Sequence, residues 1–322
     1  MQAIEYVQYG APEVLHLNEV TKPSPKPNEV LIRVYATTVT AADLMMRTGK
    51  PYVGRFYTGL KGPKRTILGF EFAGEVVETG PAVTLFKTGD KVFGGTTTLG
   101  CYAEYVCVSE HDVLTTMPEN ISYAEAAPVN GSAVTVMNFL KGLGKIQKGQ
   151  KVLIHGASGG LGTYAVQIAK HFGADVTGVC STNNVGLVKS LGADKVIDYT
   201  REDFTKNGEQ YDIIFDTVGK SSFSACRQSL TKNGVYLSAV LNFPLFLQMI
   251  RTSLLGGKKA KSSATGMLPV KERLNYFLEV KELLSKAKIK TVIDRAYPLS
   301  EVVKAHLYVE QGHKKGSVVI SV

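Results

Sequence analysis

Short apolar runs in the middle of the chain alternate with amphipathic segments. Buried parallel strands read as continuous apolar runs, whereas helices on the surface of a domain read as amphipathic ones. We therefore predict strands at 151–154, 175–180, 195–198, 211–216 and 235–240, and helices at 163–172, 184–191 and 221–230. This alternation is typical of an α/β fold with a doubly wound parallel sheet that helices cover on both faces.

Both ends of the chain follow another pattern. Short β-branched or alternating runs, separated by turns rich in proline and glycine, predict strands at 30–35, 73–79, 91–94, 102–108, 291–294 and 317–322. Residues 122–125 have the form of a capping box, which opens a helix. We infer a β-rich domain of residues 1–122 and 289–322. It is interrupted by an inserted domain of residues 123–288, and we expect a ligand cleft between the two.

A glycine-rich run follows the first strand of the predicted parallel sheet and precedes a helix. Glycines let a backbone approach phosphates closely, and a helix N-terminus supplies N–H donors and partial positive charge. We therefore predict a site for the pyrophosphate of a dinucleotide, formed by Gly156, Ala157, Ser158, Gly159, Gly160, Leu161 and Gly162. The alternative, a glycine turn without a ligand, is disfavoured by the strand before it and the helix after it.

The second predicted strand indicates which dinucleotide binds. NAD-binding domains usually place Asp or Glu roughly 20 residues beyond the glycines. Here that position is Cys180, and the residues after it, from Ser181 to Asn184, include no carboxylate that would repel a 2′-phosphate. We therefore expect NADPH in preference to NADH, with Ser181 and Asn184 as binding residues. Tyr199 and Lys315 are further candidate phosphate partners, with a plain surface position as the alternative for each.

Charge and cysteine usage limit the partners and the location. The chain has 322 residues, with 37 Lys and Arg against 28 Asp and Glu, a net charge of +9. Such a surface attracts anions, but no block of basic residues is long enough to favour nucleic acid. The four cysteines form no CxxC pair, which suits a reducing cytosol. No signal peptide is apparent. No apolar run reaches the roughly 20 residues that span a bilayer. We expect a cytoplasmic protein without a transmembrane segment.

The run from Phe243 to Leu255 is apolar but contains Pro244, Gln248 and Arg251. We interpret it as a surface helix that covers a cleft or forms a dimer contact, in preference to a membrane attachment.

Several blocks in one order carry a family resemblance. They are 28–34, 69–76, 89–94, 190–199 and 312–316, together with the glycine run. Over essentially its whole length the chain resembles the medium-chain dehydrogenase/reductase superfamily. Within it, the chain resembles the zinc-free quinone oxidoreductase branch, whose relatives include alkenal and enone reductases. The resemblance implies a GroES-like β-rich domain around a Rossmann domain, and a homodimer with a sheet-edge contact near residues 262–267.

The same resemblance argues against a metal. Zinc alcohol dehydrogenases carry Gly-His-Glu where this chain has Gly69, Phe70 and Glu71, and phenylalanine cannot bind zinc. Cys101 and Cys107 are too isolated to rebuild a four-ligand structural site. Without a Lewis acid, reduction of an electron-poor acceptor is easier than oxidation of a simple alcohol.

The resemblance also points to substrate residues. Thr40 stands where relatives often have asparagine, and Asp43 matches their aspartate, although the pair also reads as a helix capping signature. Tyr52 matches a tyrosine of the cleft and is a candidate donor to a carbonyl oxygen. Tyr57 competes for this role, and the aromatic segment 52–59 is expected to be a substrate loop.

Three further positions follow from the resemblance. Val218 and Gly219 are placed near the nicotinamide ribose, and Ala239 near the carboxamide.

The leading hypothesis is a zinc-independent, NADPH-dependent reductase that transfers hydride to quinones or α,β-unsaturated carbonyls. The alternatives are a non-catalytic NADPH- or RNA-binding protein, which the net charge supports, and an oxidoreductase of the alcohol dehydrogenase type.

Overall fold

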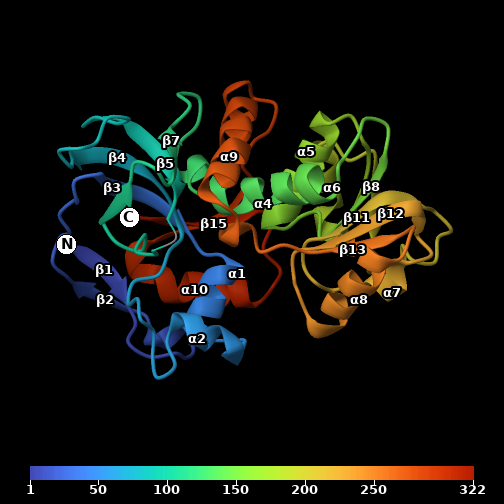
Figure 1. Ribbon diagram of the computed structural model, residues 1–322, viewed down its shortest axis with the longest axis horizontal. Coiled ribbons are helices and arrows are strands. Elements are labelled where there is room, and N and C mark those ends of the chain that lie inside the picture. The colour runs from blue at the N-terminus through green and yellow to red at the C-terminus, as the bar shows by residue number, and fades with distance from the viewer. Residues whose placement is uncertain (97) are drawn as a thin grey trace. The chain divides into compact units, whose positions relative to one another are not determined.

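The computed structural model describes residues 1–96 and 98–322, and of Val53 and Tyr57 only the backbone. The chain forms two compact units (Figure 1). The β-rich unit consists of Met1–Gly131, Pro269–Ser285 and Thr291–Val322, and the parallel-sheet unit of Ser132–Leu268 and Lys286–Lys290.

The parallel-sheet unit is built on six strands in the order β10-β9-β8-β11-β12-β13, and all neighbouring strands are parallel. The strands are β8 (Lys151–His155), β9 (Asp175–Cys180), β10 (Lys195–Asp198), β11 (Tyr211–Asp216), β12 (Leu230–Ser238) and β13 (Lys259–Lys261). The helices are α4 (Val134–Met137), α5 (Gly160–His171), α6 (Val185–Ser190), α7 (Phe223–Cys226) and α8 (Phe243–Leu254). In chain order this is the 3-2-1-4-5-6 arrangement of a doubly wound fold, which confirms the predicted class.

Three elements of this unit differ from the sequence predictions. The helix expected at 221–230 is a single turn, α7, because β12 begins at Leu230 instead of residue 235. Leu230 is buried and pairs with Tyr211, with a register shift before the next pair. The polar residues 231–233 conceal this first part of the strand. The short edge strand β13 was not predicted, whereas the surface helix expected at 243–255 is present as α8.

Lys259 connects strand β13 to the end of helix α8. The ammonium group of Lys259 donates hydrogen bonds to the carbonyls of Thr252 and Leu255. A cation at this position satisfies carbonyl groups that a helix C-terminus leaves without partners. The end of α8 is therefore fixed to the edge of the sheet.

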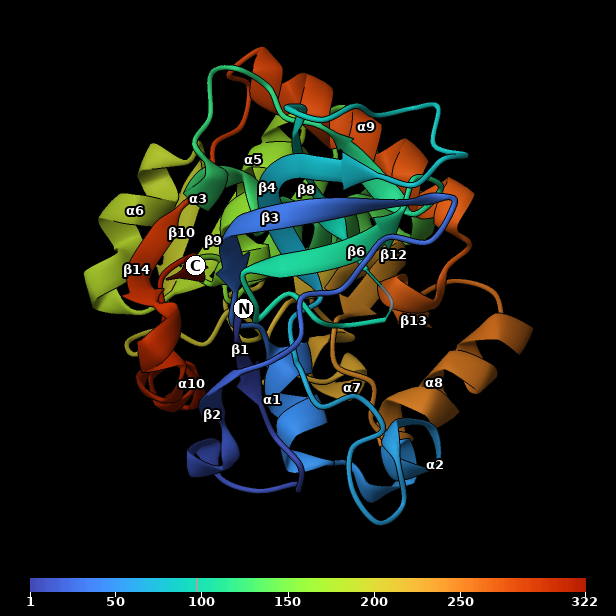
Figure 2. The same ribbon diagram turned by 90° about the vertical axis from the view of Figure 1, so that its left-hand side faces the viewer.

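The β-rich unit contains a hairpin, β1-β2, and a seven-stranded sheet in the order β14-β15-β3-β4-β5-β7, with β6 paired to β3. Figure 2 shows β6, β3 and β4 side by side. The strands are β1 (Gln2–Glu5), β2 (His16–Glu19), β3 (Glu29–Thr38), β4 (Glu71–Thr79), β5 (Lys91–Gly95), β6 (Tyr105–Ser109), β7 (Val113–Thr116), β14 (Ile293–Pro298) and β15 (Ser317–Ser321). The helices are α1 (Ala41–Thr48), α2 (Arg55–Thr58), α3 (Tyr123–Ala126), α9 (Val270–Ser285) and α10 (Val302–Glu310).

The limits of the two units differ from the predicted domains 1–122, 289–322 and 123–288. Helices α3 and α9 belong to the β-rich unit because their side chains pack on its strands. The rings of Phe93 on β5 and Phe277 on α9 lie 4.6 Å apart. Lys281 on α9 donates to the hydroxyl of Thr116 at 2.9 Å. The capping box predicted at 122–125 is present at the start of α3.

A buried carboxylate joins three segments of the β-rich unit. Glu71 on β4 is 1% exposed and accepts hydrogen bonds from the hydroxyl of Thr38 on β3 and from the N–H of Gly131 at 2.5 Å. Burial raises the pKa of Glu71 to about 7, although both hydrogen bonds favour the charged form.

Stability is therefore expected to fall as the pH rises from about 4.5, the usual value for Glu, to about 7, because the folded state holds this proton more tightly than the unfolded chain does. The change Glu71→Gln removes this titration. We expect the loss of unfolding free energy between about pH 5 and about pH 8 to be smaller in the variant by about 1–3 kcal/mol. Urea unfolding at the two pH values measures it. Glu78→Gln, which alters an exposed residue of the same strand, should lose as much unfolding free energy between the two pH values as the parent does. An equal loss of unfolding free energy in all three proteins would contradict the raised pKa of Glu71.

Candidate functional site

The glycine turn joins β8 to α5 in a geometry that side chains would block. Gly156 has a φ of 80°, in the left-handed region. A Cβ atom at Gly162 would lie 2.0 Å from the carbonyl oxygen of Gly156. These two positions therefore require glycine, and the first turn of α5 lies directly against the glycine turn.

Helix α5 begins with open hydrogen-bond donors. Its N-cap is Gly159, and no side chain caps the helix. In the described part of the chain, the N–H groups of Gly160, Leu161 and Gly162 have no hydrogen-bond partner. Unpaired amides together with the helix dipole are what a phosphate group requires. The seven predicted residues 156–162 form this turn and helix start, so they fit a pyrophosphate, and their contact with one stays a prediction.

Asn184 bridges the glycine turn and the end of β9. Its amide group donates to the hydroxyl oxygens of Ser158 at 3.0 Å and Ser181 at 3.2 Å. Its own Oδ1 is buried and has no hydrogen-bond partner among the residues that the structure describes. An unsatisfied buried acceptor costs about 1–3 kcal/mol, so this atom is suited to accept a hydrogen bond from a ribose hydroxyl. The structure thus brings together three residues that the sequence assigned to one site.

A carboxylate that the sequence reasoning missed lies at the same corner. Asp198 ends β10 and accepts hydrogen bonds from the hydroxyls of Thr182 at 2.6 Å and Thr200 at 2.8 Å. The bond from Thr182 is the largest cause that holds the pKa of Asp198 below its usual value. Residues 181–184 contain no carboxylate, as the sequence shows, but Asp198 brings one to the same edge of the sheet. The register that pairs Asp198 with Cys180 brings the acid there, and sequence spacing alone does not reveal a register.

The two other candidate phosphate partners lie in different units. Tyr199 follows β10, its N–H donates to the carbonyl of Cys180 at 3.1 Å, and its side chain is 53% exposed. It is thus at the same edge of the sheet as Ser181. Lys315 belongs to the β-rich unit, where its N–H donates to Asp294 at 2.9 Å. A phosphate contact of either residue stays a prediction.

The loop after β11 is organised by Asp216, which is fully buried. Its carboxylate accepts hydrogen bonds from the N–H groups of Val218 at 3.1 Å, Gly219 at 2.9 Å and Ser221 at 2.8 Å. The N–H of Ala239, after β12, donates to the carbonyl of Asp216 at 3.0 Å. The three residues that were predicted to lie near the nicotinamide therefore lie at one edge of the sheet, around one acid.

Neighbouring side chains keep Asp216 ionised. Burial opposes the charge, but the hydrogen bond and positive charge of His155 and the loop N–H groups outweigh it, so the pKa of Asp216 lies below its usual value. His155 Nδ1 lies 3.2 Å from this carboxylate, and its ring packs on Phe204. His155 is thus a packed side chain. The Thr217 hydroxyl donates to the carbonyl of His155 at 2.8 Å and ties the loop to the glycine turn.

In the β-rich unit, Thr40 and Asp43 form a capping box at the start of α1. The hydroxyl of Thr40 donates to Asp43 at 2.6 Å, and the N–H of Gly69 donates to the other carboxylate oxygen at 3.2 Å. Burial raises the pKa of Asp43 to about 6. The capping interpretation is confirmed, and a direct contact of either residue with substrate stays a prediction.

Tyr52 is an exposed aromatic side chain. It begins a short 3₁₀ helix (Tyr52–Gly54) and is 65% exposed. The guanidinium of Arg55 lies 4.9 Å from its ring centroid and 4.4 Å from that of Tyr9. The competing candidate, Tyr57, has a side chain outside the described part of the structure.

Phe70 occupies the position of the zinc-binding histidine in the Gly-His-Glu block and packs against a hydrophobic core. Within residues 1–96 and 98–322, no group of three or more His, Cys, Asp or Glu side chains is arranged to hold a metal ion. In the same residues, no helix combines the length and the apolar character needed to cross a bilayer.

Two family models match the chain. The one described as alcohol dehydrogenase GroES-like domain matches residues 26–119, and the one described as zinc-binding dehydrogenase matches residues 191–320.

Known proteins resemble the chain over nearly its full length. It is 33% identical to 2-methylene-furan-3-one reductase from Solanum lycopersicum, over 99% of this chain and 79% of that protein. A structure of the quinone oxidoreductase from Coxiella burnetii superposes with a TM-score of 0.87 and 31% identity, over 100% of this chain and 99% of the other. The Escherichia coli quinone oxidoreductase complexed with NADPH gives a TM-score of 0.85 and 25% identity, over 100% of both chains. Because similarity at this level spans both units, the chain belongs to the quinone oxidoreductase branch of the medium-chain dehydrogenase/reductase superfamily.

Proposed function

We propose that this protein is an NADPH-dependent reductase that transfers hydride to quinones or α,β-unsaturated carbonyls without zinc. The observation that carries the proposal is the uncapped start of α5, where three N–H donors have no partner among the described residues and lie beside a turn that requires glycine. The similarity to 2-methylene-furan-3-one reductase and to two quinone oxidoreductases supports the substrate class.

For hydride transfer the protein mainly has to position the nicotinamide and the acceptor. The cofactor, when bound, supplies the hydride, and Val218, Gly219 and Ala239 present backbone groups that would orient its nicotinamide end. The acceptor needs a hydrogen-bond donor at the oxygen where negative charge develops. The hydroxyl of Thr40 already donates to Asp43, so the exposed Tyr52 is the better candidate donor.

Zinc independence is supported by the side chains at the position of the zinc site in relatives. Phe70 has no ligand atom, and Glu71 accepts hydrogen bonds from Thr38 and Gly131. A catalytic zinc takes three protein ligands from nitrogen, sulfur or oxygen.

The preference for NADPH over NADH is part of the proposal. Ser181 and Asn184 offer neutral polar groups at the end of β9, and a structure of the Escherichia coli quinone oxidoreductase holds NADPH. Asp198 opposes the preference through its charge, which Arg201 partly offsets at 3.7 Å. We therefore expect a moderate preference.

We also propose a homodimer in the cytoplasm. Strand β13 ends the six-stranded sheet, and an edge strand leaves N–H and carbonyl groups that a second copy can pair with. The segment 262–267, expected at this contact, follows that edge, and its Met267 is 86% exposed. The four free cysteines suit a reducing compartment.

The activity itself is the first test. Purified protein should oxidise NADPH in the presence of quinones or conjugated enones, and Tyr52→Phe should lower kcat for the acceptor by about tenfold or more, because a donor to the developing oxyanion is lost. Stopped-flow absorbance at the reduced nicotinamide band measures both. Tyr276→Phe, which removes a hydroxyl that donates to Glu272 on the surface, is the matched control. Folded protein without turnover on either acceptor class would contradict the proposal, and stoichiometric zinc would favour an alcohol dehydrogenase.

Cofactor preference is tested with two opposite charge changes. Ser181→Asp adds a carboxylate beside Asn184 and should lower the ratio of kcat/KM for NADPH to that for NADH by about tenfold, or ~1.4 kcal/mol. Asp198→Asn removes a carboxylate from the same corner and should raise the ratio. Steady-state kinetics with both cofactors measures it, and Asp203→Asn in an exposed loop is the control. A ratio that neither variant moves would show that this corner does not select the cofactor.

The loop held by Asp216 gives a third test. In Asp216→Asn an NH2 group replaces one carboxylate oxygen, so the loop loses the N–H bonds that this oxygen accepts, together with the negative charge. We expect the Kd for NADPH to rise by about tenfold, since about 1.4 kcal/mol of loop positioning is lost. Calorimetric titration measures it, with thermal unfolding as a check that the variant is folded. Asp212→Asn, on the same strand but bonded to the N–H of Lys151 at the strand start, should bind as the parent does. An unchanged Kd in Asp216→Asn would rule out this role of the loop.

A further inference from the structure

Helix α8 displays large apolar side chains on the face that looks away from its own unit. Phe243, Phe246, Leu247, Ile250 and Leu254 are 72%, 47%, 49%, 47% and 82% exposed. Their spacing along the chain places all five on one helical face. We call this set the apolar stripe. Leu245 and Thr252, on the opposite face, are buried, so the helix is anchored through one side and presents the stripe to its surroundings.

The segment that contains α8 is strongly basic. From Thr217 to Lys271 the chain has no Asp or Glu and eight Lys or Arg residues, so this segment carries a charge of +8 within a total of +9. The cations are Lys220, Arg227, Lys232, Arg251, Lys258, Lys259, Lys261 and Lys271. The apolar stripe thus lies in the part of the chain that contains nearly all of the excess positive charge.

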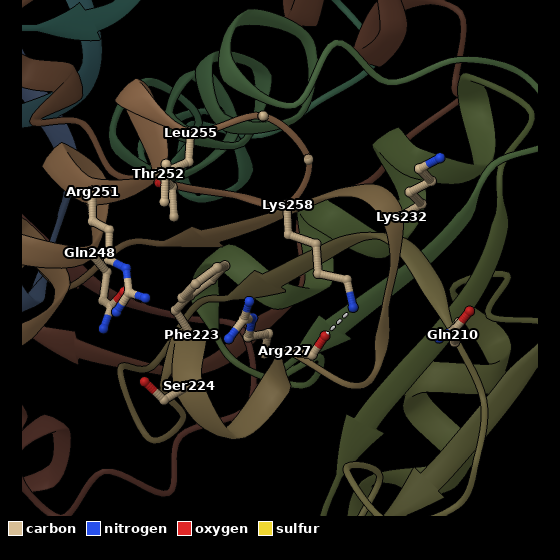
Figure 3. Close-up of a pocket in the computed structure, with 12 residues that line it drawn as sticks. Gln210, Phe223, Ser224, Arg227, Lys232, Gln248, Arg251, Thr252, Leu255 and Lys258 are labelled. Carbon is tan, nitrogen blue, oxygen red and sulfur yellow. Dashed lines mark hydrogen bonds between the residues drawn. The ribbon is translucent and has the colours of Figure 1, made fainter.

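A cavity of about 660 Å³ lies beside the stripe and collects four of these cations. It is lined by Arg227, Lys232, Arg251 and Lys258, with Leu255 and other residues from the end of α8 (Figure 3). The ammonium group of Lys258 donates to the carbonyl of Arg227 at 2.6 Å. Throughout the part of the chain that the structure describes, neither Arg227 nor Arg251 has an ion-pair partner, so both guanidinium groups are available to an external anion.

We propose that α8 and this cavity form a docking site for a bilayer surface that contains anionic phospholipid. An exposed stripe of Phe, Leu and Ile is unfavourable in water and enters the boundary between headgroups and acyl chains. Cations beside such a stripe attract anionic headgroups, and each Lys or Arg near the surface raises the affinity for an anionic bilayer about fivefold. The cavity then receives a headgroup phosphate between Arg227 and Arg251, since guanidinium groups bind phosphate through paired hydrogen bonds.

Two other occupants fit less well. In a symmetric dimer formed through the apolar stripe the same patch of both copies meets, so the basic residues beside the stripe, Arg251 and Lys258, would face the equally basic patch of the other copy. A nucleic acid would account for the charge, but it gives no reason for five exposed apolar side chains on one helical face. A lipid surface accounts for both observations.

The absence of tryptophan from the chain allows a direct experiment on the full-length protein. Phe246→Trp places the sole tryptophan on the stripe, and Leu278→Trp places it at an exposed position of α9 as the control. Vesicles of phosphatidylcholine alone are compared with vesicles that also contain phosphatidylglycerol. We expect a blue shift of the emission for Phe246→Trp only with the anionic vesicles, and none for Leu278→Trp.

Sedimentation with the same vesicles separates the two contributions. Leu247→Ser/Ile250→Ser shortens the stripe and should lower vesicle binding by about tenfold or more. Arg251→Gln/Lys258→Gln should lower vesicle binding by about 25-fold at low salt, because two cations are removed and each contributes about fivefold. The controls are Leu278→Ser/Leu307→Ser on other helices and Lys87→Gln/Lys206→Gln in exposed loops, which should bind as the parent does or nearly so.

Three results would overturn the proposal. The parent chain does not sediment with anionic vesicles at low salt, or the control variants lose binding as much as the α8 variants do. The third is a dimer in analytical ultracentrifugation that Leu247→Ser/Ile250→Ser dissociates, without any vesicle binding by the parent, which would assign the stripe to a second copy. These measurements need neither cofactor nor turnover, so their outcome is independent of the proposed reductase activity.

Discussion

The close approach of helix α5 to the turn before it is the constraint on which the site depends. The carbonyl of Gly156 occupies the space that a side chain at Gly162 would need, so the helix begins directly on the end of β8. The N-cap residue is a glycine, Gly159, so no side chain caps the helix, and within the described residues its first amides have no hydrogen-bond partner. A helix start that lacks protein partners is costly unless water or an anion satisfies it. The helix therefore lacks the stabilisation that a capping side chain gives, and its open amides can bind a phosphate group.

A second constraint extends from the same turn to the rest of the sheet edge. Asp216 ends β11, one of the two central strands of the sheet, holds the loop that follows it, and contacts His155 at the end of the neighbouring strand β8. Its charge is stabilised by N–H groups and by His155, even though the side chain is fully buried. Because the loop after β11 and the glycine turn share this network, their relative geometry is fixed before any ligand arrives. Such preorganisation lowers the cost of binding.

Much of this arrangement was readable from the sequence, because it rests on local signals. The glycine run, the alternation of strands and helices, and the capping boxes at Thr40 and Ser122 each need only neighbouring residues. Features that depend on pairing between distant strands were not readable. Asp198 reaches the end of β9 only through the register of β10, and β12 begins early because Leu230 pairs with Tyr211. Helix α9 falls in the β-rich unit because Phe277 packs on Phe93, a contact that no local pattern announces.

The lysine that closes the end of α8 has a consequence for how this part of the molecule transmits force. Lys259 is itself a residue of the outermost strand, and it grips the last carbonyls of the helix. A displacement of the end of the helix therefore also displaces the edge strand of the sheet, and a partner bound at the edge strand restrains the helix. A ligand that shifted this contact would therefore be coupled to any other ligand that shifted it, and each would change the affinity of the other by the same factor.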